Sequence, residues 1–198
     1  MIIIIRHGET AWNVQKRKQG HKNSDLTQKG RSQGVKVAKF LNKKKLNLDN
    51  FVVYSSPLKR VVDYSKIINQ NLNYNFKLKK KIKLSNLLKE HKFGKWEGKN
   101  DKEIKIMFPD QVKKRKLDRW GYIIPGGESY QLLSKRIKKF IKKINLRKNY
   151  IIFTHEMVSK VLRGIIMNYK PKKILGLTHK NTSVYIYQNK SIKEYKLK

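Results

Sequence analysis

The chain has 198 residues, of which 49 are Lys or Arg and 13 are Asp or Glu, so its formal net charge is +36 at pH 7. This length is sufficient for one domain with a sizeable core that needs no disulfides or metals. The absence of Cys excludes thiol catalysis, thiolate zinc sites and a disulfide framework. No repeat, linker or change of composition divides residues 1–198, and we expect a single domain.

The positive charge raises the question of a nucleic-acid partner, because clustered Lys and Arg release counterions from a phosphate backbone. Most of the positive residues are Lys, and they occur with an excess of Asn, Ile and Tyr, whose codons are rich in A and T. A genome-wide codon bias explains this composition, so we expect no nucleic-acid partner. The charge would still concentrate small anionic substrates near a cleft.

The sequence contains no run of 18 apolar residues and no basic start followed by a cleavable apolar segment. We therefore expect a cytoplasmic protein with no membrane partner.

The first predicted elements are a strand and a helix. Residues 1–6, MIIIIR, form a short continuous apolar run, which predicts a strand buried on both faces of a parallel sheet. After a polar loop, residues 26–44 predict a helix. Thr27 is its expected N-cap. Its expected apolar face consists of Val35, Ala38 and Leu41.

A second strand and helix follow. Residues 51–57, FVVYSSP, predict a strand that ends in small residues, and Pro57 leads into a helix over 58–70. A short strand is expected near 76–82. Residues 84–100 then form an irregular stretch rich in His, Glu, Gly and Trp, and such loops often carry function.

The C-terminal half repeats the alternation. Residues 125–144 predict a turn and a helix with an acidic first turn. Residues 150–155 predict a third buried strand, residues 158–167 a helix, and residues 183–197 a hairpin that turns at Asn189 and Lys190. The fold class expected from this order is α/β, a three-layer α/β/α sandwich with a mostly parallel sheet. The apolar stripe of the 125–144 helix consists of Leu132, Leu133, Ile137, Phe140, Ile141 and Ile144.

Polar side chains follow the three buried strands, and in such sheets ligands bind at the carboxyl ends of the strands. Arg6 and His7 end the first strand. Arg60 follows the second strand closely, and His155 ends the third. Arginines suit phosphate oxygens, and a neutral imidazole can attack phosphorus to form a phosphohistidine. Glu90, in the 84–100 loop, is the best-placed acid for protonating a leaving oxygen.

Structural explanations compete at several positions. Glu97 lies in the same loop as Glu90 and could take its place, and Asn13 could simply cap a local turn. We expect Trp96 to pack beneath its loop rather than stack on a substrate. No pattern supports chemistry for the remaining histidines, which we expect to be solvated loop residues: His21, His91 and His179.

Six short motifs occur in the order and rough spacing of a known family: RHGETAWN, QGHKNSDLTQKG, SSPLKR, LLKEHKFGKWEG, PGGES and THEMVSKVLRG. In these motifs the chain resembles the histidine phosphatase superfamily, the phosphoglycerate mutase-like proteins, from residue 2 to about residue 187. Six ordered motifs rarely coincide by chance. The resemblance implies the phosphoglycerate mutase-like form of the α/β/α sandwich.

The resemblance also implies a role for each matching residue. His7 would be the nucleophile that becomes phosphorylated, and Glu90 would protonate the leaving alcohol and then activate water. No metal and no other cofactor is implied, because the arginines do what magnesium does elsewhere. Gln19 and Gly20 flank the pocket in relatives and are weaker candidates for substrate contact. The residues implied to hold the phosphoryl group are Arg6, Arg60, His155 and Asn13.

Two positions depart from the family pattern. Glu156 stands where most relatives have Gly, directly after the second histidine. Its charge is tolerable if the side chain points away from the pocket at a helix start, whereas an inward orientation would oppose phosphate and narrow the substrate range. Asn23 stands where Asp is common.

Within the family, a mutase excludes water from its site and a phosphatase admits it. Residues 89–98, KEHKFGKWEG, have the form typical of broad-specificity and α-ribazole phosphatases, and the chain is shorter than cofactor-dependent phosphoglycerate mutases. The sequence therefore favours a metal-independent phosphomonoesterase that acts through a phosphohistidine on a small phosphorylated metabolite. One alternative is a cofactor-dependent phosphoglycerate mutase. Another is a basic phosphate-binding or RNA-binding protein with a non-catalytic site.

Substrate and assembly stay open. Specificity should depend on the loops over the pocket, 84–100 and 108–128. The C-terminal hairpin could pair with a second copy as a homodimer, or it could end as a charged edge. The second loop carries basic residues that could touch an anionic substrate tail: Lys113, Lys114, Arg115, Lys116 and Arg119.

Overall fold

The computed structural model describes residues 1–44, 46–73 and 82–197. In these residues the chain forms a six-stranded sheet with the order β3-β2-β4-β1-β5-β6. The strands β1, β2, β3 and β4 pair in parallel, whereas β5 pairs antiparallel with β1, and β6 pairs antiparallel with β5. The mostly parallel sheet is therefore confirmed. The strands are β1 Ile2–Arg6, β2 Phe51–Ser55, β3 Ile82–Leu84, β4 Asn149–Thr154, β5 Ser183–Gln188 and β6 Ser191–Lys196.

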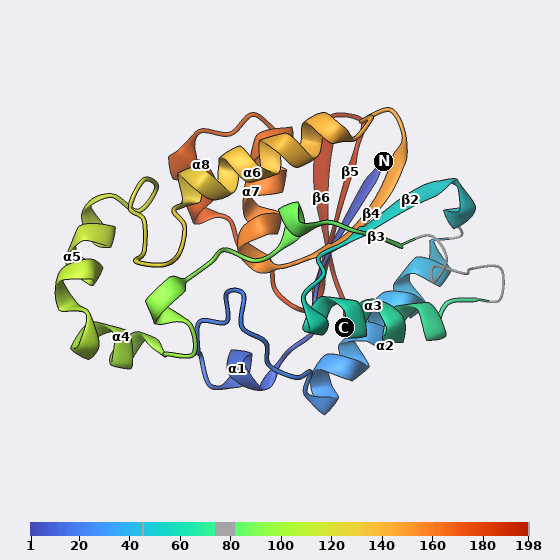
Figure 1. The fold of residues 1–198 in the computed structure, drawn as a ribbon. Coiled ribbons are helices and arrows are strands. Elements are labelled where there is room, and N and C mark those ends of the chain that lie inside the picture. The colour runs from blue at the N-terminus through green and yellow to red at the C-terminus, as the bar shows by residue number, and fades with distance from the viewer. Residues whose placement is uncertain (45, 74–81, 198) are drawn as a thin grey trace.

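Helices cover both faces of the sheet, as a three-layer sandwich requires. α2 and α3 lie on one face, and α6 and α7 lie on the other, with α8 beside α7 (Figure 1). None of the helices in the described ranges is long and apolar enough to cross a membrane. The helices are α1 Ala11–Val14, α2 Gln28–Lys43, η1 Leu48–Asn50, α3 Lys59–Gln70, η3 Asn86–Leu88, η4 Gly94–Trp96, α4 Asp101–Met107, α5 Pro109–Leu117, α6 Tyr130–Lys143, α7 Glu156–Ile166 and α8 Pro171–Gly176.

The four isoleucines of β1 explain how the layers are joined. Ile3 and Ile5 pack into the core formed with α2 and α3, and Ile2 and Ile4 pack into the core formed with α6 and α7. Each is at most 1% exposed. Because successive side chains of a strand point to opposite faces, a strand covered on both faces is apolar throughout. Burying each isoleucine contributes about 1.5–3 kcal/mol.

The helix boundaries agree with the sequence in part. Thr27 caps α2 by accepting a hydrogen bond from the Gly30 amide, as predicted. Val35 is only half-buried, because Val37 is the valine of α2 that packs into the core. Leu132 is 38% exposed, so the predicted stripe of α6 is wrong at that position. The predicted acidic first turn is also wrong, because Ser129 is the N-cap and Glu128 precedes it.

The segment between the 84–100 loop and α6 forms two helices that the sequence did not predict, α4 and α5. They lie apart from the sheet and do not cover either of its faces (Figure 1). Ile104 joins Phe93 and Trp96 in a small separate core, and Trp96 is buried beneath its loop, as predicted. Most of the strand expected near 76–82 lies outside the described residues, and the described strand in that region is β3.

The C-terminal hairpin has the predicted turn. Asn189 and Lys190, between β5 and β6, have φ angles of 50° and 58°. Two successive residues with positive φ match the right-handed twist of the flanking strands. The turn places β6 at the outer edge of the sheet.

Candidate active site

Three strands deliver the central residues of the site to one edge of the sheet. Arg6 of β1 lies opposite Thr154 of β4, and the His7 amide donates a hydrogen bond to the Thr154 carbonyl at 3.1 Å. The Ser56 amide, directly after β2, donates to the Phe153 carbonyl at 3.0 Å. The residues that follow the three strands therefore meet. The ring centroids of His7 and His155 lie 5.3 Å apart.

The His7 imidazole is held in one tautomer. Its Nδ1 lies 2.8 Å from the Gly8 carbonyl oxygen, and only a protonated Nδ1 can donate to that oxygen. Nε2 therefore keeps its lone pair. Burial lowers the pKa of His7 well below its ordinary value, and the charges of Arg60 and Arg6 lower it further. His7 is therefore a neutral imidazole at neutral pH, with an unprotonated Nε2.

Arg60 lies in the first turn of α3 and forms hydrogen bonds with the loop that follows α1. Its guanidinium donates to the carbonyl oxygens of Lys22 at 2.7 Å and Gly20 at 2.8 Å, and its amide donates to Oδ1 of Asn23 at 3.1 Å. An amide oxygen is sufficient for this last contact, so Asn23 needs no carboxylate to hold Arg60. Burial lowers the pKa of Arg60 to about 10, and the side chain stays charged at neutral pH.

Glu156 points toward the site. It is the first residue of α7, and its carboxylate lies 2.8 Å from Nη1 of Arg6. The same Nη1 donates to the His179 carbonyl. Of the two orientations considered from the sequence, the protein adopts the inward one. A negative charge therefore occupies one side of the guanidinium that the phosphoryl group is expected to use.

Glu90 has the properties of a general acid. It is 7% exposed, and its Oε1 accepts a hydrogen bond from the His91 amide at 2.8 Å. Burial raises the pKa of Glu90, and the nearby Glu156 charge raises it further, against that hydrogen bond and the two arginines. The competing candidate Glu97 accepts hydrogen bonds from the amides of His21 and Phe93 at 2.9 and 3.1 Å, which indicates a structural role.

A cavity of about 280 Å³ brings the predicted site residues together, with the exception of His155. His155 lies behind His7, and its Nε2 is 2.8 Å from Oγ of Ser56. In the described part of the chain, no three His, Asp or Glu side chains are grouped as a metal site would require. The predicted residues that line the cavity are Arg6, His7, Asn13, Gln19, Gly20, Arg60 and Glu90, and Glu156 joins them.

Asn13, Gln19 and Gly20 have structural contacts in addition to their place at the cavity. Oδ1 of Asn13 accepts hydrogen bonds from the Thr10 amide and hydroxyl, both at 3.1 Å, so Asn13 caps its local turn and keeps its NH₂ group for a ligand. Gln19 donates to the Thr10 hydroxyl at 2.7 Å. Gly20 has a φ of 54°, and a Cβ there would lie 2.0 Å from Oε1 of Glu97.

The expectation that the other histidines are solvated is wrong. His91 and His179 are fully buried, and His21 is half-buried. Nε2 of His179 lies 3.0 Å from the Ser183 carbonyl, and Nε2 of His21 lies 2.9 Å from the Glu90 carbonyl. Loops that fold over the carboxyl edge of the sheet bury these side chains, and local sequence does not show that packing.

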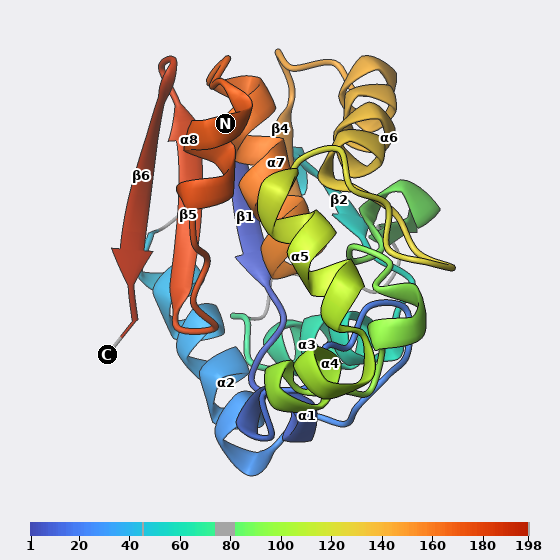
Figure 2. The ribbon, with the colours of Figure 1, turned by 90° about the vertical axis from the view of Figure 1, so that its left-hand side faces the viewer.

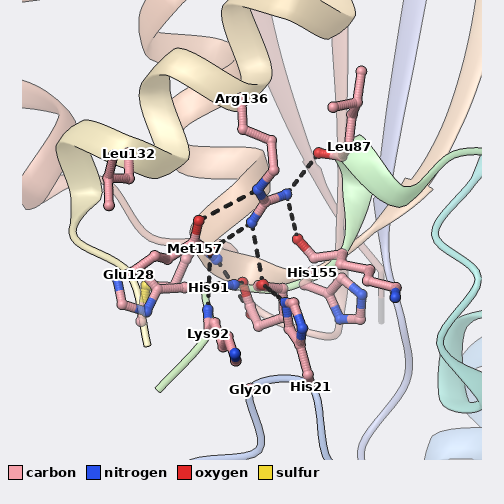
Figure 3. A network of polar contacts seen from close by, with 12 residues as sticks. Gly20, His21, Leu87, His91, Lys92, Glu128, Leu132, Arg136, His155 and Met157 are labelled. Carbon is pink, nitrogen blue, oxygen red and sulfur yellow. Dashed lines mark hydrogen bonds and ion pairs between the residues drawn. The ribbon is translucent and has the colours of Figure 1, made fainter. Parts of the chain in front are cut away.

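Arg136, on α6, is a functional candidate that the sequence did not reveal. Its Nη1 donates to the carbonyl oxygens of Leu87 and Lys89 at 2.6 and 2.8 Å, and its Nη2 donates to the Glu90 carbonyl at 3.2 Å (Figure 3). Nη2 also contacts Glu128 at 2.6 Å. Arg136 therefore holds the backbone that carries Glu90. No sequence signal distinguishes it from the other 48 cations.

Comparison with known proteins decides the family. The model of the histidine phosphatase superfamily (branch 1) matches residues 2–194. The chain belongs to this superfamily. The matched range includes all the positions that the motif resemblance assigned, and the resemblance is confirmed.

Individual relatives of this chain carry different names. It is 30% identical over 196 residues to Phosphoglycerate mutase-like protein 4 of Arabidopsis thaliana, across 94% of this chain and 78% of that protein. It is 31% identical over 167 residues to Fructose-2,6-bisphosphatase of Saccharomyces cerevisiae, across 84% of this chain and 34% of the yeast protein. The crystal structure of the Alpha-ribazole Phosphatase from Shigella flexneri superposes with a TM-score of 0.79 at 22% identity, covering 99% of this chain and 95% of that chain, which shows the shared fold.

Proposed function

We propose that this histidine phosphatase is a metal-independent phosphomonoesterase that forms a phosphohistidine at Nε2 of His7. The state of the His7 imidazole carries the proposal. Its Nδ1 proton is bound to the Gly8 carbonyl, so Nε2 is the free nucleophile in a cavity lined by Arg6 and Arg60. The low pKa of His7 keeps this nitrogen unprotonated at neutral pH.

In the first half-reaction, Nε2 of His7 attacks the phosphorus atom, and the bond from phosphorus to the alcohol oxygen breaks. The Glu90 carboxyl group donates its proton to that oxygen, and the alcohol leaves. Arg6, Arg60 and the NH₂ group of Asn13 hold the phosphoryl oxygens and stabilise their charge. His155 supports the His7 ring from behind.

In the second half-reaction, the Glu90 carboxylate takes a proton from a water molecule as the water oxygen attacks phosphorus. The phosphorus–nitrogen bond breaks, inorganic phosphate leaves, and His7 and protonated Glu90 are regenerated. The substrate would be a small phosphorylated metabolite.

Two observations favour hydrolysis over phosphoryl return to substrate. The phosphoryl cavity adjoins a second cavity of about 520 Å³, which gives the leaving alcohol a way out and water a way in. The yeast relative is also named as a bisphosphatase. The name of the Arabidopsis relative supports phosphoglycerate mutase activity as the alternative, and the experiment below separates the two.

The test compares wild-type protein with His7→Ala and with His7→Asn, which keeps a polar side chain. Both are assayed with chelator present against a panel of phosphomonoesters that includes 3-phosphoglycerate with its bisphosphate primer. We expect phosphate release by the wild type and a loss of about 10³-fold or more in kcat for both variants. Alkaline quenching of the wild type should trap an acid-labile phosphoenzyme.

The other outcomes are equally informative. Full turnover by a folded His7→Ala protein would refute the proposal. Formation of 2-phosphoglycerate without phosphate release would establish the mutase alternative. Tight, salt-sensitive binding of RNA with no turnover of any phosphomonoester would favour a non-catalytic phosphate-binding protein.

A further inference from the structure

The cavity of about 520 Å³ beside the phosphoryl site has a chemistry of its own. α4, α5 and the loop that contains η4 build most of its wall, on the side of the molecule where α4 and α5 stand apart from the sheet (Figure 1), which faces the viewer in Figure 2. It shares Phe93 and Met157 with the phosphoryl cavity. An ester with its phosphoryl group at His7 would therefore extend its alcohol past these two residues into the second cavity.

The floor of this second cavity is apolar and largely aromatic. Phe93, Trp96, Ile104 and Tyr130 line it, and each is at most 6% exposed. Flat apolar groups pack well on such a surface, and the volume is in the range of small-molecule sites.

Arg115, on α5, lies against this floor in an unusual state. Its guanidinium carbon lies 5.4 Å from the Trp96 ring centroid, 5.8 Å from that of Tyr130 and 5.9 Å from that of Phe93. Its Nη1 is buried and has no hydrogen-bond partner among the described residues. A buried N–H without an acceptor is costly, and an anionic ligand would satisfy it.

The rest of the cavity wall is positively charged, as Arg115 is. Lys105, Lys116 and Arg119 also line the cavity. The carboxylate of Asp101 lines it too, but it is neutralised by Lys18 at 2.9 Å. The cavity thus combines an aromatic floor with a net positive charge, because among the described residues that line it the cations outnumber the carboxylates.

We propose that this cavity binds the leaving alcohol of the substrate, and that this alcohol has a flat apolar body with a second anionic group that accepts a hydrogen bond from Arg115. The inference rests on the proposed phosphatase function for the position of the phosphoryl end. The second anionic group is a carboxylate or a phosphate, which present the same charged oxygens to the guanidinium.

The test measures, for each protein variant, the ratio of kcat/KM for an anionic probe to kcat/KM for phenyl phosphate. The probes are phenyl phosphate, 4-carboxyphenyl phosphate and 1,4-phenylene bisphosphate. We expect the wild type to prefer one or both of the anionic probes over phenyl phosphate by about 10-fold or more, because hydrogen bonds to charged groups are strong. The preferred probe identifies the carboxylate or the phosphate as the recognised group.

Arg115→Met keeps the packing of the side-chain stem and removes the guanidinium, so the ratio should fall to near one. Lys102→Met removes the same charge from an exposed position of α4 outside the cavity lining, and the ratio of kcat/KM values should stay at the wild-type value. If Arg115→Met does not fold, Arg119→Gln replaces it as the test variant, because Arg119 also lines the cavity. This variant should lower the ratio by a smaller factor than the loss of Arg115, because Arg119 is exposed.

Failure of this inference can be separated from failure of the proposed function. A His7-dependent hydrolysis of phenyl phosphate, with a ratio near one in the wild type, would overturn the inference and leave the phosphatase intact. If no probe is hydrolysed, calorimetric titration of the His7→Ala protein decides. Tighter binding of 4-hydroxybenzoate or 4-hydroxyphenyl phosphate than of phenol, with the difference lost on adding Arg115→Met, would support the proposed anion recognition. Equal binding of these ligands and phenol, or a difference that Arg115→Met leaves unchanged, would overturn it.

Discussion

At the scale of single residues, Glu156 affects two parts of the site in opposite ways. Its carboxylate contacts Arg6 at 2.8 Å, so under the proposed mechanism it would compete with a phosphoryl group for that guanidinium. The same charge helps to raise the pKa of Glu90, after burial, which favours the protonated form of the proposed acid. A Gly at this position would have neither effect.

The first prediction concerns inhibition by orthovanadate, which resembles the transferred phosphoryl group. Glu156→Gln should lower the inhibition constant by about 2- to 5-fold, because the partly exposed ion pair that vanadate displaces is weak. Glu194→Gln, which makes the same change of charge on β6, should leave the constant unchanged. An equal or higher constant for Glu156→Gln would show that the carboxylate does not compete for Arg6.

The second prediction concerns pH. Glu90 must be protonated for the first half-reaction, so kcat/KM should fall as pH rises through its raised pKa. Activity should persist well below pH 6.5, because the pKa of His7 is lowered and the imidazole stays neutral there. In Glu156→Gln the alkaline limb of the profile should move to lower pH, and an unmoved limb would assign that limb to another group.

At the scale of elements, the position of Glu90 depends on α6. η3 and the residues that follow it carry three carbonyl groups that Arg136 binds, at Leu87, Lys89 and Glu90. Glu128 fixes Arg136 from the other side at 2.6 Å (Figure 3). The helix therefore fixes the loop that carries Glu90, although no residue of α6 lines the phosphoryl cavity.

The third prediction follows from this contact. Arg136→Gln should lower kcat by about 10- to 100-fold, because a displacement of the acid by about 1 Å is costly in this kind of chemistry. KM should change little, since Arg6 and Arg60 are untouched. Lys139→Gln, at an exposed position of α6, is the matched control. A rise in KM with normal kcat would assign Arg136 to substrate binding instead.

The same scale shows what could be predicted from the sequence. β1, the Thr27 cap and the Asn189–Lys190 turn depend on local patterns and were predicted. α4 has no clear apolar stripe and begins at the capping box of Asn100, so periodicity did not reveal it. Among the site residues, those at strand ends and in motifs were found. Arg136 and the buried His179 were not, because their roles depend on tertiary contacts.

At the scale of the whole molecule, the net charge of +36 affects encounter with any anionic substrate. Positive potential steers phosphate esters toward the site, and salt screens it over a Debye length of about 10 Å at 0.1 M. The charge is spread along the chain, and we keep the prediction that the protein has no nucleic-acid partner.

The fourth prediction is that kcat/KM for a phosphomonoester falls several-fold between low and high ionic strength, whereas kcat stays nearly constant. Steady-state kinetics across a sodium chloride series would measure both. A kcat that falls in parallel would show that salt acts on the catalytic groups themselves, by occupying Arg6 or Arg60, rather than on encounter.

The pairing of β1 also has a consequence during synthesis. The four consecutive isoleucines of β1 are synthesised before both of its neighbours in the sheet, β4 and β5, which begin at Asn149 and Ser183. At about 5–20 residues per second, β1 stays without either neighbour for roughly 7–30 s. Such a segment is prone to aggregate while it waits. The nascent chain therefore depends on the flanking Arg6 and on the many lysines made in the interval, whose mutual repulsion keeps unfinished chains apart.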